Sequence, residues 1–377
     1  MRKKIILTFG TRPEAIKMAP VYLALKRDRA FSVKLALTGQ HSALLDEALD
    51  IFAMSPEYNL NIMTAAQSLA DITSSAVKQL DTVYKKEKPD LVMVHGDTST
   101  TFASALSAFY NGIPSAHVEA GLRTGNKNEP FPEELNRVLT DSISDILFPP
   151  TRGALLNIKR EGLRPRLISV TGNTIVDAAN LISRDERAVS ARARRLAEKP
   201  FVLLTMHRRE SWGKPMEGVF YFLKNYFTAA RGLRVIYPVH PNPVVKNAAA
   251  KILGASDNIV LMEPLNYRDL IYLLKNCFFT VTDSGGIQEE ALVFGKKVVL
   301  LRKRTERPEG VAAGFVKVAG TSPSKIRSCV SALIKDSAVK KTFRNPYGDG
   351  RAGERITQSL RKYFELPVLS NIRDFMV

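Results

Sequence analysis

The stretch "CFFTVTDSGGIQEEALVFGKKVVLLR", residues 277–302, contains a strand, a turn, a helix and a second strand in immediate succession. Its two ends are short apolar runs typical of buried strands, and a glycine pair separates the first run from a segment of helical pattern. Gly295 closes that helix. Two strands joined through a helix are typical of parallel neighbours in one sheet, so the stretch predicts a βαβ unit.

The turn in this stretch predicts an anion site. Ser284, Gly285 and Gly286 lie where the strand becomes the helix. Backbone N–H groups at a helix N-terminus have no helical acceptor, and the helix dipole favours negative charge there. Glu289 and Glu290 follow directly. Carboxylates do not bind an anion, so these two glutamates serve a different role or none.

The same alternation of apolar runs and helical segments extends along the whole chain. Runs such as "KKIILTFG" and "PDLVMVHGD" form one series, and "FVLLTMH" and "LRVIYPVH" belong to a second. Two series predict two Rossmann-like, doubly wound α/β domains. We expect the first to span residues 1–168 and the second 169–355, with a C-terminal helix within 356–377 packing back on the first.

The composition is ordinary for a soluble globular protein. The chain has 377 residues, of which 45% are hydrophobic and 24% charged. Cys277 and Cys329 give neither a disulfide framework nor a metal-ligand spacing. No apolar run approaches the roughly 20 residues that span a bilayer. We therefore expect a cytoplasmic protein with reduced thiols, without a metal and without membrane insertion.

The net charge of +18 is unevenly distributed. Residues 1–168 carry 21 Lys+Arg against 18 Asp+Glu, and the remainder carries 34 against 19. Solvated helix faces explain most of this excess, and an anionic ligand on the second half would use part of it. Basic and aromatic residues are not interleaved as in nucleic-acid-binding modules. We therefore expect no nucleic-acid partner.

Two cations follow the first strand. "TFGTRPEAIKMAP" places Thr11 and Glu14 in a capping-box pattern, with Pro13 in the first turn of the helix. Capping does not account for Arg12 and Lys17. Contact with a phosphate and simple solvation of the two side chains are equally compatible with this segment.

Acidic side chains collect at the carboxyl ends of the expected strands, where open α/β sheets bind their ligands. Asp97 and Glu119 end neighbouring strands, and Glu133 opens a helix. Converging carboxylates raise each other's pKa, which prepares a carboxyl group for acid or base chemistry. Helix capping by Asp97 and interaction of Glu133 with the helix dipole are the simpler interpretations.

Histidines occupy the same strand ends. His95, His117, His207 and His240 each follow an apolar run. A structural histidine is the more common interpretation for any one of them. His207 precedes Arg208 and Arg209 in "HRRES", and all three would face the crevice at the strand ends.

A set of segments spans nearly the whole chain: "FGTRPEAIKMAPV", "VHGDTSTT", "HVEAGLRTGN", "PEELNR", "VTGNTIVDA", "HRRES", "PVHPNP", "TDSGGIQEEA", "TERPEG" and "NPYGDG". In this order, the segments resemble those of the non-hydrolysing UDP-N-acetylglucosamine 2-epimerase family. The resemblance implies a glycosyltransferase-B-like fold, with two Rossmann-like domains around a central cleft, in a cytoplasmic homodimer without a cofactor. It also implies reversible conversion of UDP-N-acetylglucosamine to UDP-N-acetylmannosamine for surface polysaccharides, by elimination of UDP to a 2-acetamidoglucal and re-addition.

The resemblance also implies roles for individual residues. The turn at Ser284, Gly285 and Gly286 would hold the diphosphate, and Glu290 would hold the ribose hydroxyls. The cations that would contact the nucleotide or its phosphates are Arg12, Lys17 and Arg307. The side chains that would surround the sugar are Asp97, Glu119, Glu133 and His207.

A second, regulatory nucleotide site is incomplete by the same comparison. Residues that match it are Gln40, His41, Gln67, Arg208 and His240. The chain has Ser42-Ala43-Leu44 and Ala66 where polar or charged residues are common in the family. Activation by substrate is therefore left open.

Two other functions are compatible with parts of the sequence. A glycosyltransferase of the same fold would share the nucleotide turn but would need an acceptor site. A basic, non-catalytic binding protein would bind polyanions, but the carboxylates at 97, 119 and 133 would repel a phosphate backbone.

Overall fold

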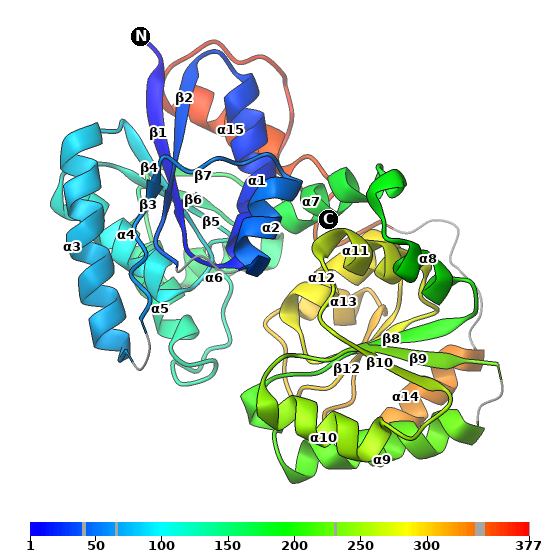
Figure 1. Ribbon diagram of the computed structural model, residues 1–377. Coiled ribbons are helices and arrows are strands. Elements are labelled where there is room, and N and C mark those ends of the chain that lie inside the picture. Colours follow the sequence, from blue (N-terminus) through cyan, green and yellow to red (C-terminus); the bar gives the residue numbers. More distant parts are fainter. Residues whose placement is uncertain (40–42, 65–66, 230–231, 336–343, 377) are drawn as a thin grey trace. The chain divides into compact units, whose positions relative to one another are not determined.

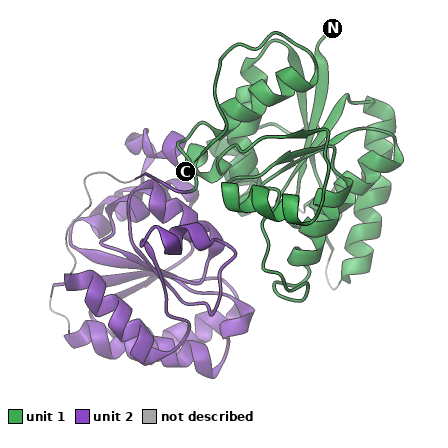
Figure 2. Ribbon diagram, turned by 180° about the vertical axis from the view of Figure 1, so that it is seen from behind, with its two compact units in different colours: residues 1–178, 347–377 green, residues 179–346 purple. Residues whose placement is uncertain are grey.

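The computed structural model describes residues 1–39, 43–64, 67–229, 232–335 and 344–376. Figure 2 shows the two compact units into which the chain divides. The first unit contains Met1–Ala178 and Tyr347–Val377, and the second contains Ala179–Pro346. Whether the chain forms domains with limits at 168 and 355 stays a prediction.

The first unit is built on a parallel sheet with the strand order β3-β2-β1-β4-β5-β6-β7 among the described residues. The order reverses between β1 and β4, which pair in parallel through Ile5 and Leu91. Such a switch point is where open α/β sheets bind ligands. The strands are β1 (Lys3–Phe9), β2 (Phe31–Leu37), β3 (Tyr58–Asn59), β4 (Leu91–His95), β5 (Ser115–Val118), β6 (Ile146–Phe148) and β7 (Leu167–Ile168).

Helices cover both faces of this sheet (Figure 1). Helices α3, α4 and α5 cover one face, and α1, α2 and α15 cover the other. Tyr84 of α3 is fully buried and hydrogen bonds to Thr8 of β1 at 3.0 Å. The helices of the unit are α1 (Arg12–Arg27), α2 (Ala43–Ile51), α3 (Leu69–Glu87), α4 (Ser99–Tyr110), α5 (Glu133–Ile143), α6 (Arg152–Arg160) and α15 (Ala352–Tyr363).

The second unit repeats this architecture with the order β10-β9-β8-β11-β12-β13. Its strands are β8 (Phe201–Thr205), β9 (Arg234–Pro238), β10 (Ile259–Met262), β11 (Thr280–Thr282), β12 (Val298–Leu300) and β13 (Val316–Val318). Its helices are α8 (Ala191–Ala197), α9 (Lys214–Ala229), α10 (Pro243–Leu253), α11 (Tyr267–Asn276), α12 (Gly285–Val293), α13 (Pro308–Ala312), α14 (Pro323–Lys335) and the 3-10 turns η1 (Glu186–Ala188) and η2 (Arg209–Ser211). Helix α7 (Thr174–Ser183) crosses the limit between the units.

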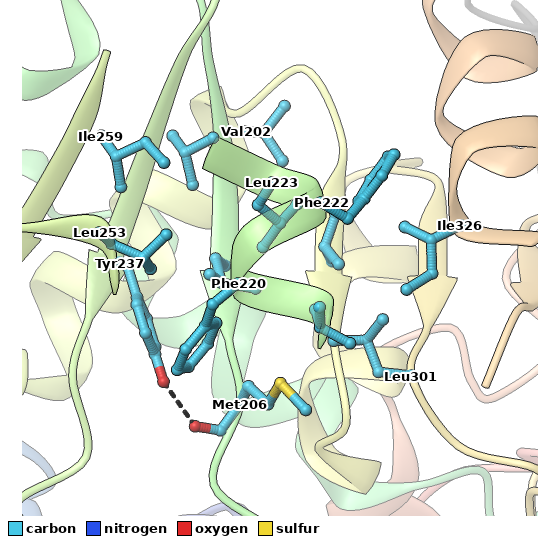
Figure 3. Close-up of a cluster of buried hydrophobic side chains, with 14 of the residues drawn as sticks. Val202, Met206, Phe220, Phe222, Leu223, Tyr237, Leu253, Ile259, Leu301 and Ile326 are labelled. Atoms are coloured by element: carbon cyan, nitrogen blue, oxygen red, sulfur yellow. Dashed lines mark hydrogen bonds between the residues drawn. The ribbon is translucent and has the colours of Figure 1, made fainter. Parts of the chain in front are cut away.

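The core of the second unit fixes the end of β8. Phe220 and Leu223 of α9 pack against Val202 and Tyr237 of the sheet (Figure 3). The Tyr237 hydroxyl donates to the Met206 carbonyl at 2.7 Å, and burial raises its pKa. The residue after β8 is therefore anchored on the core side, directly before His207.

The C-terminal helix belongs to the first unit. It packs on α1, and Arg361 forms a two-oxygen ion pair with Asp28 at 2.6 and 2.7 Å. Both sheets are parallel in every registered strand pair, which confirms the predicted class of two Rossmann-like, doubly wound units. None of the described helices combines the length and apolar character that a membrane crossing requires.

Candidate active site

The first unit places Glu119 in a cluster of donors at the end of β5. Its carboxylate oxygen Oε2 contacts Lys17 Nζ, accepts from Asn173 Nδ2 at 2.7 Å, and lies 3.7 Å from His95 Nε2. The Lys17 and Glu119 side chains are 7% and 8% exposed. A buried charge needs a partner and hydrogen bonds, so this arrangement holds an ionised carboxylate at a strand end.

The loop before α1 has the predicted capping box, in which Glu14 is the acceptor. Glu14 Oε2 accepts from the Thr11 nitrogen at 2.8 Å and from the Thr11 hydroxyl at 2.7 Å. Its other oxygen accepts from Thr98 at 2.8 Å, at the start of α4. Glu14 therefore joins the loops that follow β1 and β4. Arg12 is the first residue of α1, at this helix N-terminus.

Asp97 and Glu133 are connected through Arg137. The Arg137 Nη2 atom lies 2.9 Å from Asp97 Oδ2, and Nε donates to the Glu133 carbonyl at 3.5 Å. One carboxylate oxygen of Glu133 is buried and has no hydrogen-bond partner among the described residues. Arg137 was not singled out from the sequence, where "PEELNR" carried no sign that it pairs with Asp97.

His117 has a structural role. Its Nε2 lies 2.7 Å from the Gly96 carbonyl, and its Nδ1 lies 2.6 Å from Asp141 Oδ1. Burial favours a raised pKa for Asp141, but His117 and Arg123 outweigh burial and lower it. The Nε2 contact thus joins β5 to the end of β4, and the Nδ1 contact joins it to α5. A structural role was the more common interpretation of a strand-end histidine.

In the second unit, the guanidinium of Arg307 lies against the glycine turn at the start of α12. Ser284 is the N-cap of α12, and its Oγ accepts from the Ile287 nitrogen at 3.5 Å. A Cβ added to Gly285 would lie 2.8 Å from Arg307 Nη1, whereas one added to Gly286 would meet nothing nearer than Ser284 Oγ at 4.0 Å. Glycine at 285 therefore lets the Arg307 cation pack against the N-terminus of α12.

Two glutamates orient Arg307. Its Nε donates to Glu289 Oε1 at 2.6 Å, and its Nη1 contacts Glu306. Burial opposes ionisation of Glu306, but Arg307 and Arg302 outweigh it and lower its pKa. The first glutamate after the turn therefore positions the cation. Glu290, the second, is 5% exposed on the same helix.

His207 is held by Asp283 at the end of β11. Asp283 Oδ2 accepts from the backbone nitrogens of His207 and Arg208, both at 2.8 Å. The His207 ring stacks on His240 with centroids 5.1 Å apart. Partial burial lowers the pKa of His207, with His240 and Arg208 adding to this and Asp283 opposing it. The imidazole is therefore mainly neutral near pH 7 and able to accept a proton.

The residues considered for a regulatory site belong to both units. Gln40 and His41 lie outside the described residues. Gln67 of the first unit donates to the Ile62 carbonyl at 2.8 Å and accepts from the Thr64 nitrogen at 2.7 Å. Arg208 and His240 belong to the second unit, where Arg208 Nε donates to the Asp283 carbonyl at 3.1 Å.

The carboxylates of Asp97 and Glu119, each paired with a cation in the first unit, and the helix N-terminus beside Arg307 in the second unit agree with the sequence resemblance. A family model described as UDP-N-acetylglucosamine 2-epimerase matches residues 23–361. The chain belongs to that family. The family's reaction is an isomerisation, so the predicted enzyme class is confirmed as well.

Relatives and solved structures agree with this assignment. A Bacillus subtilis protein named UDP-N-acetylglucosamine 2-epimerase is 48% identical over 360 residues, covering 95% of this chain and 94% of its own. The S. aureus protein MnaA, solved with UDP, has a TM-score of 0.92 at 45% identity and covers 99% of this chain and 100% of its own. The UDP-GlcNAc 2-epimerase of Neisseria meningitidis, solved with UDP-GlcNAc, has a TM-score of 0.90 at 38% identity, covering 95% and 100%.

Proposed function

We propose that this chain interconverts UDP-N-acetylglucosamine and UDP-N-acetylmannosamine by epimerisation at C2 of the sugar. The observation that carries this proposal is the set of carboxylates in the first unit: Asp97 after β4, Glu119 after β5 and Glu133 at the start of α5. A sugar transferase needs the nucleotide turn but has no need of several acidic groups for proton transfer at C2. The names and bound nucleotides of the relatives support the same substrate.

The second unit would bind the UDP moiety. The backbone N–H groups of Gly285 and Gly286, in the turn that Ser284 caps, suit a diphosphate, because a helix N-terminus attracts an anion. Arg307 adds a guanidinium beside the turn, held by Glu289 at 2.6 Å. Glu290 has the acceptor oxygens that ribose hydroxyls require. Arg12 and Lys17 in the first unit are the further cations that we expect to contact the nucleotide or its phosphates.

The reaction would proceed by elimination and re-addition. The C1–O bond breaks, the electron pair leaves with UDP, and the developing positive charge at C1 acidifies the proton on C2. A side-chain base removes that proton, which leaves a C1–C2 double bond in 2-acetamidoglucal. UDP then adds back at C1 while an acid protonates C2 on the opposite face. Atoms and charges balance without an external reagent.

The side chains supply what these steps need. Carboxylates stabilise positive charge at C1, and the N–H groups and Arg307 stabilise the departing diphosphate. Asp97, Glu119, Glu133 and His207 are the groups that we assign to the sugar. The lowered pKa of His207 keeps its ring neutral near pH 7, so it can take up a proton in either direction.

The test is proton NMR of the purified protein with UDP-N-acetylglucosamine in D₂O, with no acceptor present. Growth of UDP-N-acetylmannosamine with deuterium at C2 is the expected result, because C2 exchanges its proton with solvent. Epimerisation that retains the original proton at C2 would contradict this mechanism. Free UDP and sugar without exchange would indicate hydrolysis or an idle transferase instead.

Three further features are proposed on the resemblance alone. They are a homodimer, a cytoplasmic location, and use of the product for surface polysaccharides. Sedimentation analysis of the purified protein tests the first of them directly, and a monomer at micromolar concentration would contradict it.

A further inference from the structure

Asn173 is a neutral side chain that donates a hydrogen bond to Glu119. It lies just before α7, is 2% exposed, and donates from Nδ2 to Glu119 Oε2 at 2.7 Å. Its own carbonyl oxygen accepts from the Ile175 nitrogen at 3.0 Å. Since that N–H can only donate and the carboxylate can only accept, the two bonds fix which end of the amide faces Glu119.

The other groups that face this carboxylate are charged or titratable. Lys17 reaches it from α1, and His95 reaches it from β4 at 3.7 Å. The Glu119 backbone has φ +70°, in the left-handed region that non-glycine residues seldom adopt. Backbone strain of this kind concentrates at functional sites.

The peptide that carries Asn173 is held by the C-terminal segment. The Asn173 nitrogen donates to the Tyr347 carbonyl at 2.6 Å, and Phe375 donates to Val170 at 2.7 Å. Arg355 Nη1 donates to the Thr171 carbonyl at 3.1 Å. Gly172 has φ +82°, and a Cβ added there would lie 3.3 Å from the Gly348 Cα. Residues 170–173 are therefore held by hydrogen bonds to the C-terminal segment, which is distant in the sequence.

We propose that Asn173 is a positioning residue that orients the Glu119 carboxylate for the reaction, and that the segment from Tyr347 onward sets its place. This inference rests on the proposed function, in which Glu119 faces the sugar. A structural alternative is available, because Asn173 also caps α7 through the Ile175 nitrogen. The two roles use opposite ends of one amide, so a substitution can separate them.

The test substitution is Asn173→Asp. Aspartate keeps the oxygen that caps the helix, and aspartate and asparagine are similarly good caps. The substitution replaces the Nδ2 group that donates to Glu119 with a carboxylate oxygen, so that two negatively charged groups face each other. We expect kcat to fall about tenfold to a hundredfold, as displaced catalytic groups do, while KM changes far less. The added charge would raise the pKa of Glu119, so the acid limb of the kcat profile should move to higher pH.

Asn126→Asp is a matched control. Asn126 also accepts from a nitrogen two residues ahead, that of Asn128 at 3.1 Å, and its Nδ2 lies 3.5 Å from a carboxylate, that of Glu129. All of these groups are exposed on a loop of the same unit. This variant should keep the kcat and the pH profile of the wild type. Asn173→Ser, which retains a capping oxygen but is too short to reach Glu119, should lower kcat without the pH shift.

The possible failures are distinguishable. Wild-type kcat and an unshifted profile in Asn173→Asp would overturn the positioning role while leaving the proposed function intact. A loss of kcat accompanied by a lower unfolding midpoint and no shift of the acid limb would show a purely structural role. Absence of C2 exchange in the wild type would overturn the proposed function and this inference together.

Discussion

The buried carboxylate of Asp283 accepts a hydrogen bond from the backbone nitrogen of His207 at 2.8 Å, which joins the end of β11 to the end of β8. The Arg208 nitrogen donates to the same oxygen at 2.8 Å. Asp283→Ala would leave both donors without this acceptor, at a cost of about 1–3 kcal/mol each where they stay buried. We expect the second unit to lose that much unfolding free energy in urea titrations, with reduced turnover.

Asp257→Ala is the control for this loss, because Asp257 is an exposed carboxylate of the same unit. Its unfolding free energy should stay within about 0.5 kcal/mol of the wild type. Equal stability of the two variants would contradict the role assigned to Asp283.

The two glycines of the turn should differ in their tolerance of alanine. Gly285→Ala places a Cβ 2.8 Å from Arg307 Nη1, whereas Gly286→Ala meets nothing nearer than 4.0 Å. Displacing the guanidinium should weaken UDP binding by roughly 1.5–3 kcal/mol, the range for hydrogen bonds to charged groups. Isothermal titration with UDP should show the loss in Gly285→Ala and a much smaller one in Gly286→Ala. A similar loss in both would show that Arg307 is not the cause.

Glu289 and Glu290, which are adjacent in α12, should contribute to the binding of different parts of the nucleotide. Glu290→Ala should weaken uridine and UDP alike, because we assign Glu290 to the ribose. Glu289→Ala releases Arg307, which Glu289 holds at 2.6 Å, so it should weaken UDP more than uridine. Each loss should reach roughly 1.5–3 kcal/mol, the range for hydrogen bonds to charged groups. An unchanged uridine affinity in Glu290→Ala would refute the ribose assignment.

The proposed acidic groups should be needed for turnover and not for nucleotide binding. Asp97→Asn preserves the size of a side chain that lies 2.9 Å from Arg137 but removes its charge. We expect turnover to fall roughly 10²–10⁴-fold, the usual contribution of a positioned acid or base. His207→Ala should lower it similarly. UDP affinity of Asp97→Asn, measured by titration, should stay near the wild-type value, and wild-type turnover would remove Asp97 from the site.

Asp177 should make the first unit less stable as the pH rises. Burial raises its pKa from 3.8 to about 6, although it accepts from the Gly353 nitrogen at the start of α15 at 2.9 Å. Because the folded pKa is raised, its contribution is fully present below about pH 4 and is lost as the pH rises through about 6. Two pKa units correspond to about 3 kcal/mol.

Asp177→Asn removes this titration while keeping the shape of the side chain. The wild type should therefore lose about 3 kcal/mol relative to the variant between about pH 4 and about pH 7. Urea unfolding of both proteins at the two pH values measures the difference directly. A pH-independent gap between them would show that Asp177 has an ordinary pKa in the folded protein.

Much of the fold was predictable, because it is encoded locally. The alternation of apolar runs and helices indicated the parallel sheets, and the box of Thr11 and Glu14 indicated the start of α1. The turn at Ser284 was equally visible. Each of these signals lies within a few residues of sequence, which is the range over which periodicity and capping rules apply.

The partners within the site were not predictable, because they join distant segments. Glu119 and Asn173 are 54 positions apart, and Glu289 and Arg307 are 18 apart. No local pattern assigns Asn173 a second task beyond capping α7. Likewise, His117 and His207 both follow apolar runs. Their contacts distinguish them: His117 bonds to Asp141 and has a structural role, whereas His207 stacks on His240 and is assigned a chemical role.

The return of the C-terminal segment to the first unit has a consequence for biosynthesis. The Tyr347 carbonyl and the Phe375 nitrogen complete the support of residues 170–173, yet the ribosome makes them after the entire second unit. Domains generally fold as their sequence emerges. The first unit of a nascent chain would therefore stay incompletely folded while residues 179–346 are translated, because its last contacts come from residues 347–377.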